Sequence, residues 1–517
     1  MKFYLSLLIG ILFAFSVNSQ TNDLKCSIDA QTAALIKDRL MHNRANIKSL
    51  DVTSGNRNIT YIPLTIHNVS NTAGEGRTPE TVIMAFLCGL NAIYADQDVQ
   101  FFIYNQIRNV ANNYIDGNAF TTNASFAMSS LRVSGTLNLF IGRSINNLSA
   151  SYYSGAGDYV FLLQTMLSPA AKTEAHEIGH FFTLPHTFYG WEGLDAEATY
   201  GGQAVPAIIG SGWSSFRPEA VARTGSQANC ATRADGFCDT PADYYSNREP
   251  CPYSPSVLDP YGATLTPDAT NLMSYAYDNC VNNFTAEQKQ AIALDINARS
   301  WGTNTPNSTV DITTSPTILS PADNTPLGPI TNSTVRLDWS DVTGATWYYI
   351  EVVGTIVPGI WLINTNDVIY RGISYSSQSH FDLSTANLVA GQYYGWRVKA
   401  LNGLSTCAPL TNWSKFEASV ATDIDQLPME NTLQCKVVNN PVQTQSLSLN
   451  ISAAKDMVAS IKVFGLDGRE VTSVNSCVIA EGTTVIQLPL DGVANGTYLA
   501  TLHTEKGVIR SKFIVQR

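Results

Sequence analysis

The distribution of hydrophobic positions divides the chain into a leader, a mixed α/β region and a long β-rich region. An uninterrupted apolar run occupies residues 3–17. In residues 57–303, short β-branched and aromatic runs such as 61–67 alternate with segments whose apolar residues recur at helical spacing, such as 83–90. Beyond residue 315, only short β-type runs separated by Gly, Asn and Pro remain. The pattern predicts a multidomain protein with an α/β domain followed by two all-β sandwich domains.

The first residues predict export from the cell. Lys2 precedes the apolar run, and the small residues Val17 and Ser19 occupy the positions expected before a cleavage site, so residues 1–19 are predicted to be a signal peptide. The run is shorter than the ~20 residues that span a bilayer, and no other apolar stretch reaches that length, so we expect no transmembrane helix. Nine cysteines in an exported chain predict disulfides and at least one odd thiol.

The overall charge disfavours one class of function. With 42 acidic and 31 basic residues, the net charge is −11, and no Lys/Arg-rich run is present. Nucleic-acid-binding proteins usually carry a basic face, so we expect no nucleic-acid partner. The hydrophobic fraction of 44% is sufficient for several packed cores and excludes global disorder.

Three of the seven histidines fall within eleven residues and predict a metal site. On a helix, His176 and His180 lie one turn apart, about 6 Å along the axis, so both imidazoles reach the same Zn²⁺. A straight helix would carry His186 about 15 Å from His176, so the helix must end near Thr183 for the third ligand to return. Three protein ligands leave one position open for water, which is typical of catalytic zinc.

These residues resemble those of a known family. The run His176 to His186 resembles the metzincin signature HExxHxxGxxH, and residues 236–241 and 271–275 are similar to segments of the pappalysin (cytophagalysin, ulilysin-like) branch. The resemblance implies a zinc endopeptidase that cleaves protein or peptide substrates with a metal-bound water. It implies that Glu177 is the general base, Met273 the Met-turn methionine, and Tyr275 a stabiliser of the tetrahedral intermediate. A structural role for Tyr275 remains the alternative.

The resemblance also bears on the turn and on the cysteines. Thr183 stands where the family has glycine, so the turn either uses ordinary backbone angles or is strained by ~1–3 kcal/mol. Four cysteines cluster within 51 residues. The sequence alone allows three connectivities, and the family implies the pairs Cys230–Cys251 and Cys238–Cys280.

Several further residues are candidates for regulation, calcium binding and specificity. Cys26 is a candidate zymogen switch, because a thiolate can occupy the water position of zinc; a disulfide partner or an incidental thiol is the alternative. Structural Ca²⁺ near Asp235, Asp239 and Asp243 is suggested by some relatives, and a solvated loop is equally consistent with them. Asp278 is a candidate for favouring basic substrate residues. The strand at residues 159–162 is predicted to be the sheet edge that pairs with substrate.

The C-terminal half resembles two β modules. Residues 337–340 and 394–400 are similar to a fibronectin type III-like sandwich, whose tryptophans we expect in the core. The last ~85 residues resemble a type IX secretion sorting domain, which implies the secretion machinery as a partner and a secreted or cell-surface location. The predicted layout is signal peptide 1–19, propeptide 20–56, catalytic domain 57–303, linker 304–315, fibronectin-like domain 316–420 and sorting domain 432–517.

Two other functions remain open at this stage. One is a surface adhesin that has an inactive metalloprotease fold, against which the intact Glu177 argues. The other is a metal-dependent amidase that acts on a substrate other than protein. The natural substrate is not identified by any motif.

Overall fold

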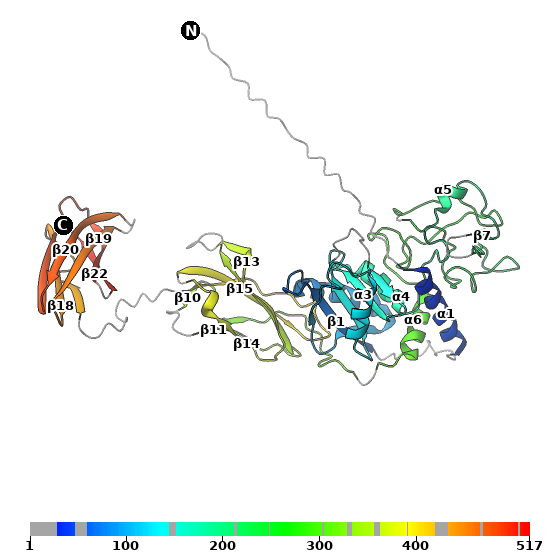
Figure 1. The fold of residues 1–517 in the computed structure, drawn as a ribbon, viewed down its shortest axis with the longest axis horizontal. Coiled ribbons are helices and arrows are strands. Elements are labelled where there is room, and N and C mark those ends of the chain that lie inside the picture. Colours follow the sequence, from blue (N-terminus) through cyan, green and yellow to red (C-terminus); the bar gives the residue numbers. More distant parts are fainter. Residues whose placement is uncertain are drawn as a thin grey trace, which may run out of the picture.

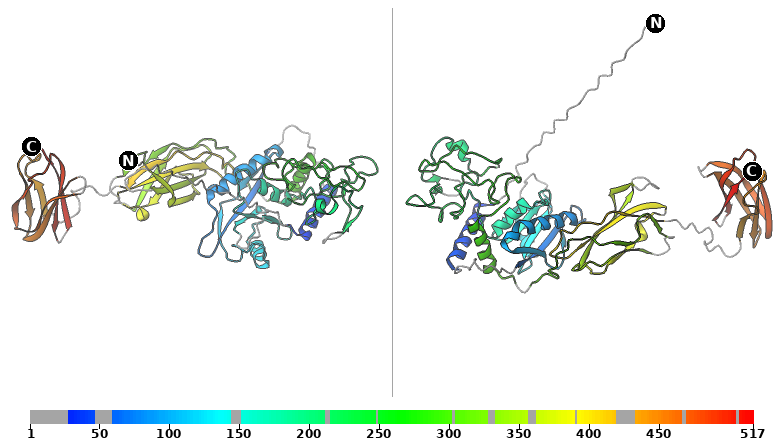
Figure 2. Two further views of the ribbon diagram at one scale, coloured as in Figure 1. Left: turned by 90° about the horizontal axis from the view of Figure 1, so that it is seen from above. Right: turned by 180° about the vertical axis from the view of Figure 1, so that it is seen from behind.

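The chain folds into an α/β unit and two β sandwiches, each with its own core (Figures 1 and 2). The computed structural model describes residues 28–46, 59–143, 151–210, 215–247, 249–301, 304–327, 333–355, 362–389, 391–418, 433–465, 469–504 and 507–517. The predicted signal peptide and Cys26 lie outside these ranges. No helix within them is long and apolar enough to cross a membrane.

A six-stranded sheet organises the α/β unit. Its strands run in the order β2-β1-β4-β6-β5, and β3 pairs with the end of β1. All pairings are parallel except that of β5 with β6. The strands are β1 (Thr60–Ser70), β2 (Val99–Ile103), β3 (Arg108–Ala111), β4 (Leu137–Gly142), β5 (Tyr152–Ser154) and β6 (Tyr159–Leu163). The near-continuous apolar character of β4 and β6 follows from their burial on both faces.

Helices cover both faces of this sheet. One face packs against α2 (Glu80–Tyr94) and α4 (Lys172–Phe181), and the other packs against α3 (Thr122–Leu131). Helix α6 (Ala286–Ala298) begins with a capping box in which Thr285 and Gln288 satisfy each other's backbone N–H groups. The remaining helical segments that the structure describes are α1 (Ala30–Asn46), α5 (Ala196–Tyr200) and the 3₁₀ turn Ala95–Gln97, together with a 3₁₀ turn at Thr385–Asn387 in the second unit.

The predicted propeptide contributes a helix that packs on the α/β unit. Asn43 of α1 donates a hydrogen bond to the buried Asp295 carboxylate of α6 at 3.0 Å. Lys37 donates to the carbonyl of Ala234 at 3.0 Å, and its pKa is lowered to about 8, chiefly by burial. Ile36 and Leu40 lie in the core. Helix α1 is therefore an integral part of this folded state.

The prediction that residues 159–162 form the sheet edge is wrong. Strand β6 lies between β4 and β5, and the edge is the antiparallel strand β5. At three residues, β5 is too short to give a clear alternating pattern in the sequence. The outermost strand on this side of the sheet is therefore β5.

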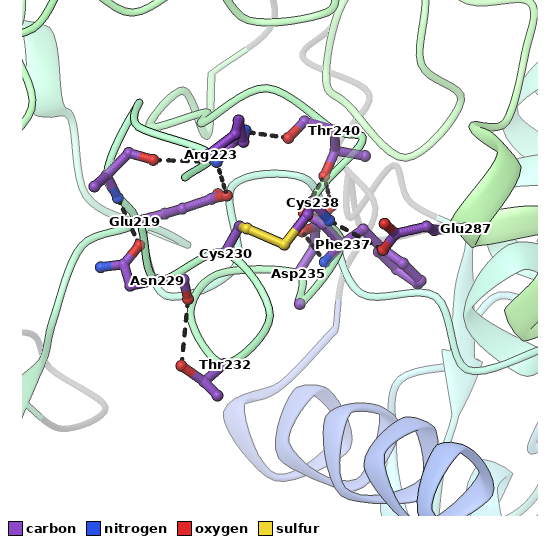
Figure 3. Close-up of a disulfide and its surroundings, with 12 residues drawn as sticks. Glu219, Arg223, Asn229, Cys230, Thr232, Asp235, Phe237, Cys238, Thr240 and Glu287 are labelled. Carbon is purple, nitrogen blue, oxygen red and sulfur yellow. Dashed lines mark hydrogen bonds and ion pairs between the residues drawn. A yellow bond between two sulfur atoms is a disulfide. The ribbon is translucent and has the colours of Figure 1, made fainter. Parts of the chain in front are cut away.

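The family-derived disulfide pairing is also wrong. The structure pairs Cys230 with Cys238 and Cys251 with Cys280. The segment from Cys230 to Cys238 closes a tight loop, in which Asp235 accepts hydrogen bonds from the N–H of Phe237 and the hydroxyl of Thr240 (Figure 3). This loop brings the Cα atoms of Cys230 and Cys238 to 5.0 Å from each other, which is close enough for a disulfide.

A local β-bridge explains the second pair. Glu249 and Ala276 form a parallel bridge, and the N–H of Tyr277 donates to the carbonyl of Glu249 at 3.0 Å. This bridge carries Cys251 alongside Cys280, with their Cα atoms 5.9 Å apart. A third disulfide, Cys88–Cys407, was not predicted and joins residues 319 positions apart.

The second unit is a sandwich of a five-stranded and a three-stranded sheet, in the orders β10-β16-β15-β12-β13 and β14-β11-β9. Its strands are β9 (Ile318–Ser320), β10 (Thr325–Leu327), β11 (Thr334–Trp339), β12 (Trp347–Thr355), β13 (Ile363–Ser374), β14 (His380–Ser384), β15 (Gln392–Leu401) and β16 (Ser414–Ala418). Trp339 and Trp396 lie in the core of this sandwich, as predicted. Trp347 is buried against the α/β unit instead, and Trp413 is half-buried beneath the guanidinium of Arg397.

The predicted linker 304–315 is partly wrong, because its middle belongs to this sandwich. Ile312 is 3% exposed within the core, and its N–H donates to the hydroxyl of Ser405. Asn402 donates to the carbonyl of Val310. Although the segment has few apolar residues, its backbone hydrogen bonds fix it against the sandwich.

The third unit has sheets in the orders β17-β18-β21 and β20-β19-β22-β23. Its strands are β17 (Leu433–Val437), β18 (Ser446–Ala453), β19 (Met457–Gly465), β20 (Glu470–Ile479), β21 (Gly482–Pro489), β22 (Gly496–Thr504) and β23 (Gly507–Val515). Buried side chains of both sheets, among them Leu449, Ile461 and Phe513, form its core.

Candidate metal centre

The three histidines converge on one point. The Nε2 atom of His180 lies 3.0 Å from Nε2 of His176 and 3.2 Å from Nε2 of His186. All three side chains are buried. Among the residues that the structure describes, they form the one trio of His, Cys, Asp or Glu close enough to share a metal ion.

Each imidazole is held by its other nitrogen. Nδ1 of His176 lies 2.7 Å from the carbonyl oxygen of Leu272, and Nδ1 of His180 lies 2.7 Å from that of Leu184. Nδ1 of His186 lies 3.1 Å from Oε1 of Glu192. A carbonyl or carboxylate oxygen requires a proton on Nδ1, so the lone pair of every Nε2 points to the shared centre.

The electrostatics of the cluster favour neutral imidazoles. Burial, followed by the proximity of the other histidines, lowers the pKa of His180 and of His186 well below the ordinary value. Neutral imidazole is the form that binds metal. Three neutral nitrogen donors packed this closely repel one another unless a cation lies between them, so the donor set fits zinc.

The turn that returns His186 follows directly after α4. The N–H of Leu184 donates to the carbonyl of Gly179, and the N–H of Thr183 donates to that of His180, which is the Schellman arrangement for ending a helix. Its left-handed position is occupied by Thr183, with φ of 69°. Of the two conformations that the sequence left open, the structure has the strained one.

This strain leads to a stability prediction for Thr183→Gly. Left-handed backbone at a β-branched residue costs ~1–3 kcal/mol, and the buried Thr183 hydroxyl has no hydrogen-bond partner. Glycine removes both costs, with ~0.5–1 kcal/mol lost to unfolded-chain entropy. We expect the free energy of unfolding to rise by about 1 kcal/mol, measured by urea unfolding of the zinc-loaded protein. Thr183→Ala retains the strained Cβ and should gain less, and a fall in stability on Thr183→Gly would contradict the strain.

Met273 packs against α4 at Gly179, the residue before His180. Its side chain is fully buried, and a Cβ built on Gly179 would come within 2.6 Å of its sulfur, so only glycine permits this contact with α4. The loop also provides the Leu272 carbonyl that holds His176. The structure therefore brings the two distant motifs of the sequence into one site.

Glu177 and Tyr275 lie beside the histidines. Glu177 follows His176 on α4 and is fully buried. The ring of Tyr275 lies 4.9 Å from that of His186 and 5.9 Å from that of His176. Both residues line one pocket with His176, whose other lining residues are Met166, Lys172, Thr173, Leu272, Ser274, Ala276, Asp278 and Val281.

The three candidate calcium ligands do not assemble. Asp239 accepts hydrogen bonds from the hydroxyl of Thr285 and the N–H of Glu287. Asp243 accepts from the hydroxyl of Thr187, and Asp235 is held within its own loop. Within the described ranges, their oxygens do not form a metal-sized group. The geometry gives the calcium prediction no support.

Glu192 is the site residue that sequence reasoning missed. Its Oε1 atom contacts His186, and its Oε2 atom accepts a hydrogen bond from the N–H of Gly190. The signal available was a carboxylate six residues after a predicted ligand, next to a glycine. Such a residue belongs to no part of the signature, and only the folded turn places it on the imidazole.

Two sequence relatives identify metalloproteases as homologues of this chain. Over 241 residues, the chain is 27% identical to an extracellular metalloprotease of Neurospora crassa and 28% identical to one of Sordaria macrospora, covering 43% of this chain and 68% of each relative. Among solved structures, it is similar to mature mirolysin of Tannerella forsythia in complex with a cleaved peptide, at 16% identity and a TM-score of 0.30, over 46% of this chain and 91% of that one. A promirolysin mutant of the same organism gives 16% identity and a TM-score of 0.34, over 52% and 88%.

The last unit matches a defined family. Residues 437–516 match the family described as the secretion system C-terminal sorting domain. This match confirms the predicted sorting domain and the predicted location. The chain is thus a homologue of metalloproteases that carries a C-terminal sorting domain for type IX secretion to the cell surface or the extracellular space.

Proposed function

We propose that the protein is a secreted, zinc-dependent endopeptidase of the pappalysin-like metzincin type. The observation that carries this proposal is the convergence of three buried Nε2 atoms, each oriented through Nδ1 by an acceptor. Bound zinc would be held by His176, His180 and His186, and would polarise a peptide carbonyl and lower the pKa of a water molecule.

The remaining chemistry is assigned to two side chains that line the adjoining pocket. Glu177 takes the proton of the attacking water as general base and delivers it to the leaving amine. Tyr275 stabilises the negative charge that develops on the carbonyl oxygen. Its ring lies beside the rings of two predicted ligands and lines the same pocket as Glu177, which supports this role.

The other domains are assigned supporting roles. Residues 1–19 direct export as a signal peptide. The second unit is assigned to the fibronectin type III-like class, which is supported by its division into two sheets, antiparallel except for the β10–β16 pair, and by the buried Trp339 and Trp396 between them. The zymogen role of Cys26 stays a proposal from the sequence. An extended substrate pairs with the edge strand β5.

Asp278 leads to a prediction about substrate preference. It lines the pocket beside His176 and is exposed, so its attraction for a basic substrate residue is screened by water. Lys172 lines the same pocket, and its positive charge repels a basic substrate residue. For Asp278→Asn we expect the kcat/KM ratio of a Lys-containing to an Ala-containing peptide to fall about threefold to fivefold. Lys172→Met should raise this ratio, and an unchanged ratio in Asp278→Asn would remove the residue from specificity.

The function is tested with the secreted full chain and casein as substrate. We expect cleavage products detectable by mass spectrometry and one zinc ion per active chain by metal analysis. The full chain is required, because Cys88 of the α/β unit is bonded to Cys407 of the sandwich. A zinc-loaded chain that cleaves neither casein nor a mixed peptide pool would overturn the peptidase proposal and favour the adhesin.

A further inference from the structure

The β sandwich is joined to the α/β unit by a continuous interface. Three contacts come from the loop after β15: a disulfide from Cys407 to Cys88, a hydrogen bond from the Thr406 hydroxyl to the carbonyl of Met84 at 3.0 Å, and one from the N–H of Ile103 to the carbonyl of Gly403 at 2.7 Å. Two of these contacts fall on helix α2. The third covers the edge strand β2, whose backbone would otherwise face solvent.

The hydrophobic core crosses the same boundary. Trp347, Tyr349 and Leu401 of the sandwich are 0–3% exposed and belong to the core cluster of the α/β unit. At the rim, the N–H of Ile107 donates to the hydroxyl of Tyr375 at 3.0 Å. A flexible spacer would show neither a shared core nor buried hydrogen bonds across its boundary. The sandwich is therefore part of the framework of the α/β unit.

Helix α2 connects this interface to the metal centre. Next to Cys88, a Cβ on Gly89 would lie 2.0 Å from the carbonyl oxygen of Pro169, so α2 lies directly on the turn that precedes α4. At the end of α2, the buried Tyr94 donates through its hydroxyl to the carbonyl of Ala175 at 3.1 Å. Ala175 immediately precedes His176. One side of α2 thus contacts the sandwich and another side contacts the helix that carries two predicted ligands.

We propose that the sandwich acts as a clamp that positions the metal-binding helix α4 through α2, with Cys88, Thr406 and Tyr94 as positioning residues. This inference rests on the proposed zinc site. Loss of the clamp lets α2 shift, and the imidazoles of His176 and His180 then leave the geometry that one ion requires. Displacements of about 1 Å at a reacting centre change rates by up to about 100-fold.

The test compares the full chain with its Cys88→Ser/Cys407→Ser variant. We expect the zinc dissociation constant, measured by chelator competition, to rise about tenfold and kcat for a peptide substrate to fall about tenfold, with KM changed less than twofold. The matched control is Cys230→Ser/Cys238→Ser, which removes a disulfide from a local loop. It should change neither the zinc dissociation constant nor kcat more than twofold. If the wild-type chain binds zinc but cleaves no peptide, the proposed function fails while the zinc measurement still decides the clamp.

Two milder variants guard against misfolding and separate positioning from general stability. Thr406→Val keeps the disulfide and the side-chain volume, and removes the hydrogen bond to the carbonyl of Met84 on α2. Like the double serine variant, it should raise the zinc dissociation constant. Tyr94→Phe removes only the bond to Ala175. If the clamp acts through α2, combining Tyr94→Phe with the double serine variant should weaken zinc binding less than the product of the separate effects. The proposal would be overturned if the effects of Tyr94→Phe and of Cys88→Ser/Cys407→Ser on the zinc dissociation constant multiplied fully. It would also be overturned if the zinc affinity of both Cys88→Ser/Cys407→Ser and Thr406→Val stayed within twofold of wild type.

Discussion

Replacing Glu177 by Gln is expected to lower kcat for casein-derived peptides by about 10²- to 10⁴-fold at unchanged zinc content. The amide has nearly the same shape as the carboxylate but cannot accept the proton of the attacking water. The three histidines do not depend on Glu177 for orientation, because their Nδ1 atoms bond to Leu272, Leu184 and Glu192. The measurement is a steady-state peptide assay on wild type and variant, with zinc in each sample determined by metal analysis.

A matched control separates this chemistry from the loss of a buried charge. Glu174 lies one turn earlier on α4, is 1% exposed and accepts a hydrogen bond from the N–H of Ser168. Burial raises its pKa to about 7. Glu174→Gln should retain kcat within about tenfold, because the side chain binds the preceding turn. If Glu177→Gln retained more than a tenth of wild-type kcat, Glu177 would not be the general base.

The sequence predicted the parts of the site that depend on local geometry. The spacing of His176 and His180 is set by the helix itself, and the return of His186 follows because a straight helix would carry it out of reach. The strained conformation of Thr183 was one of two stated outcomes. The strands β1 and β6 and the helix α2 were likewise visible as apolar runs at residues 61–67, 159–162 and 83–90.

What the sequence missed depends on contacts between distant segments. The pairings of Cys230, Cys251 and Cys88 follow from how loops fold back, and the spacing of cysteines carries no such information. The clamp loop at 402–407 has no distinctive composition, and its role comes only from its position on α2 and β2. The short strand β5 and the contact of Glu192 with His186 are hidden for the same reason.

The contact of Glu192 with His186 gives the second large expected effect. Among the three predicted ligands, Nδ1 of His186 contacts a side chain, whereas Nδ1 of His176 and of His180 contacts a backbone carbonyl. Carboxylates in this position fix the tautomer and raise the basicity of a ligating histidine, and their removal costs 10- to 100-fold in metal affinity. For Glu192→Gln we therefore expect the zinc dissociation constant to rise by about 10- to 100-fold in chelator competition.

The zinc dependence of activity then distinguishes orientation from general damage. If Glu192 acts only through His186, excess zinc should restore most of the kcat of Glu192→Gln, because the occupied site has its three ligands and Glu177 intact. Glu192→Asp keeps the charge on a shorter side chain and should fall between wild type and the amide variant. Activity that stays low in Glu192→Gln at saturating zinc would assign this carboxylate a role in the reaction itself, and unchanged zinc affinity would show that His186 is oriented without it.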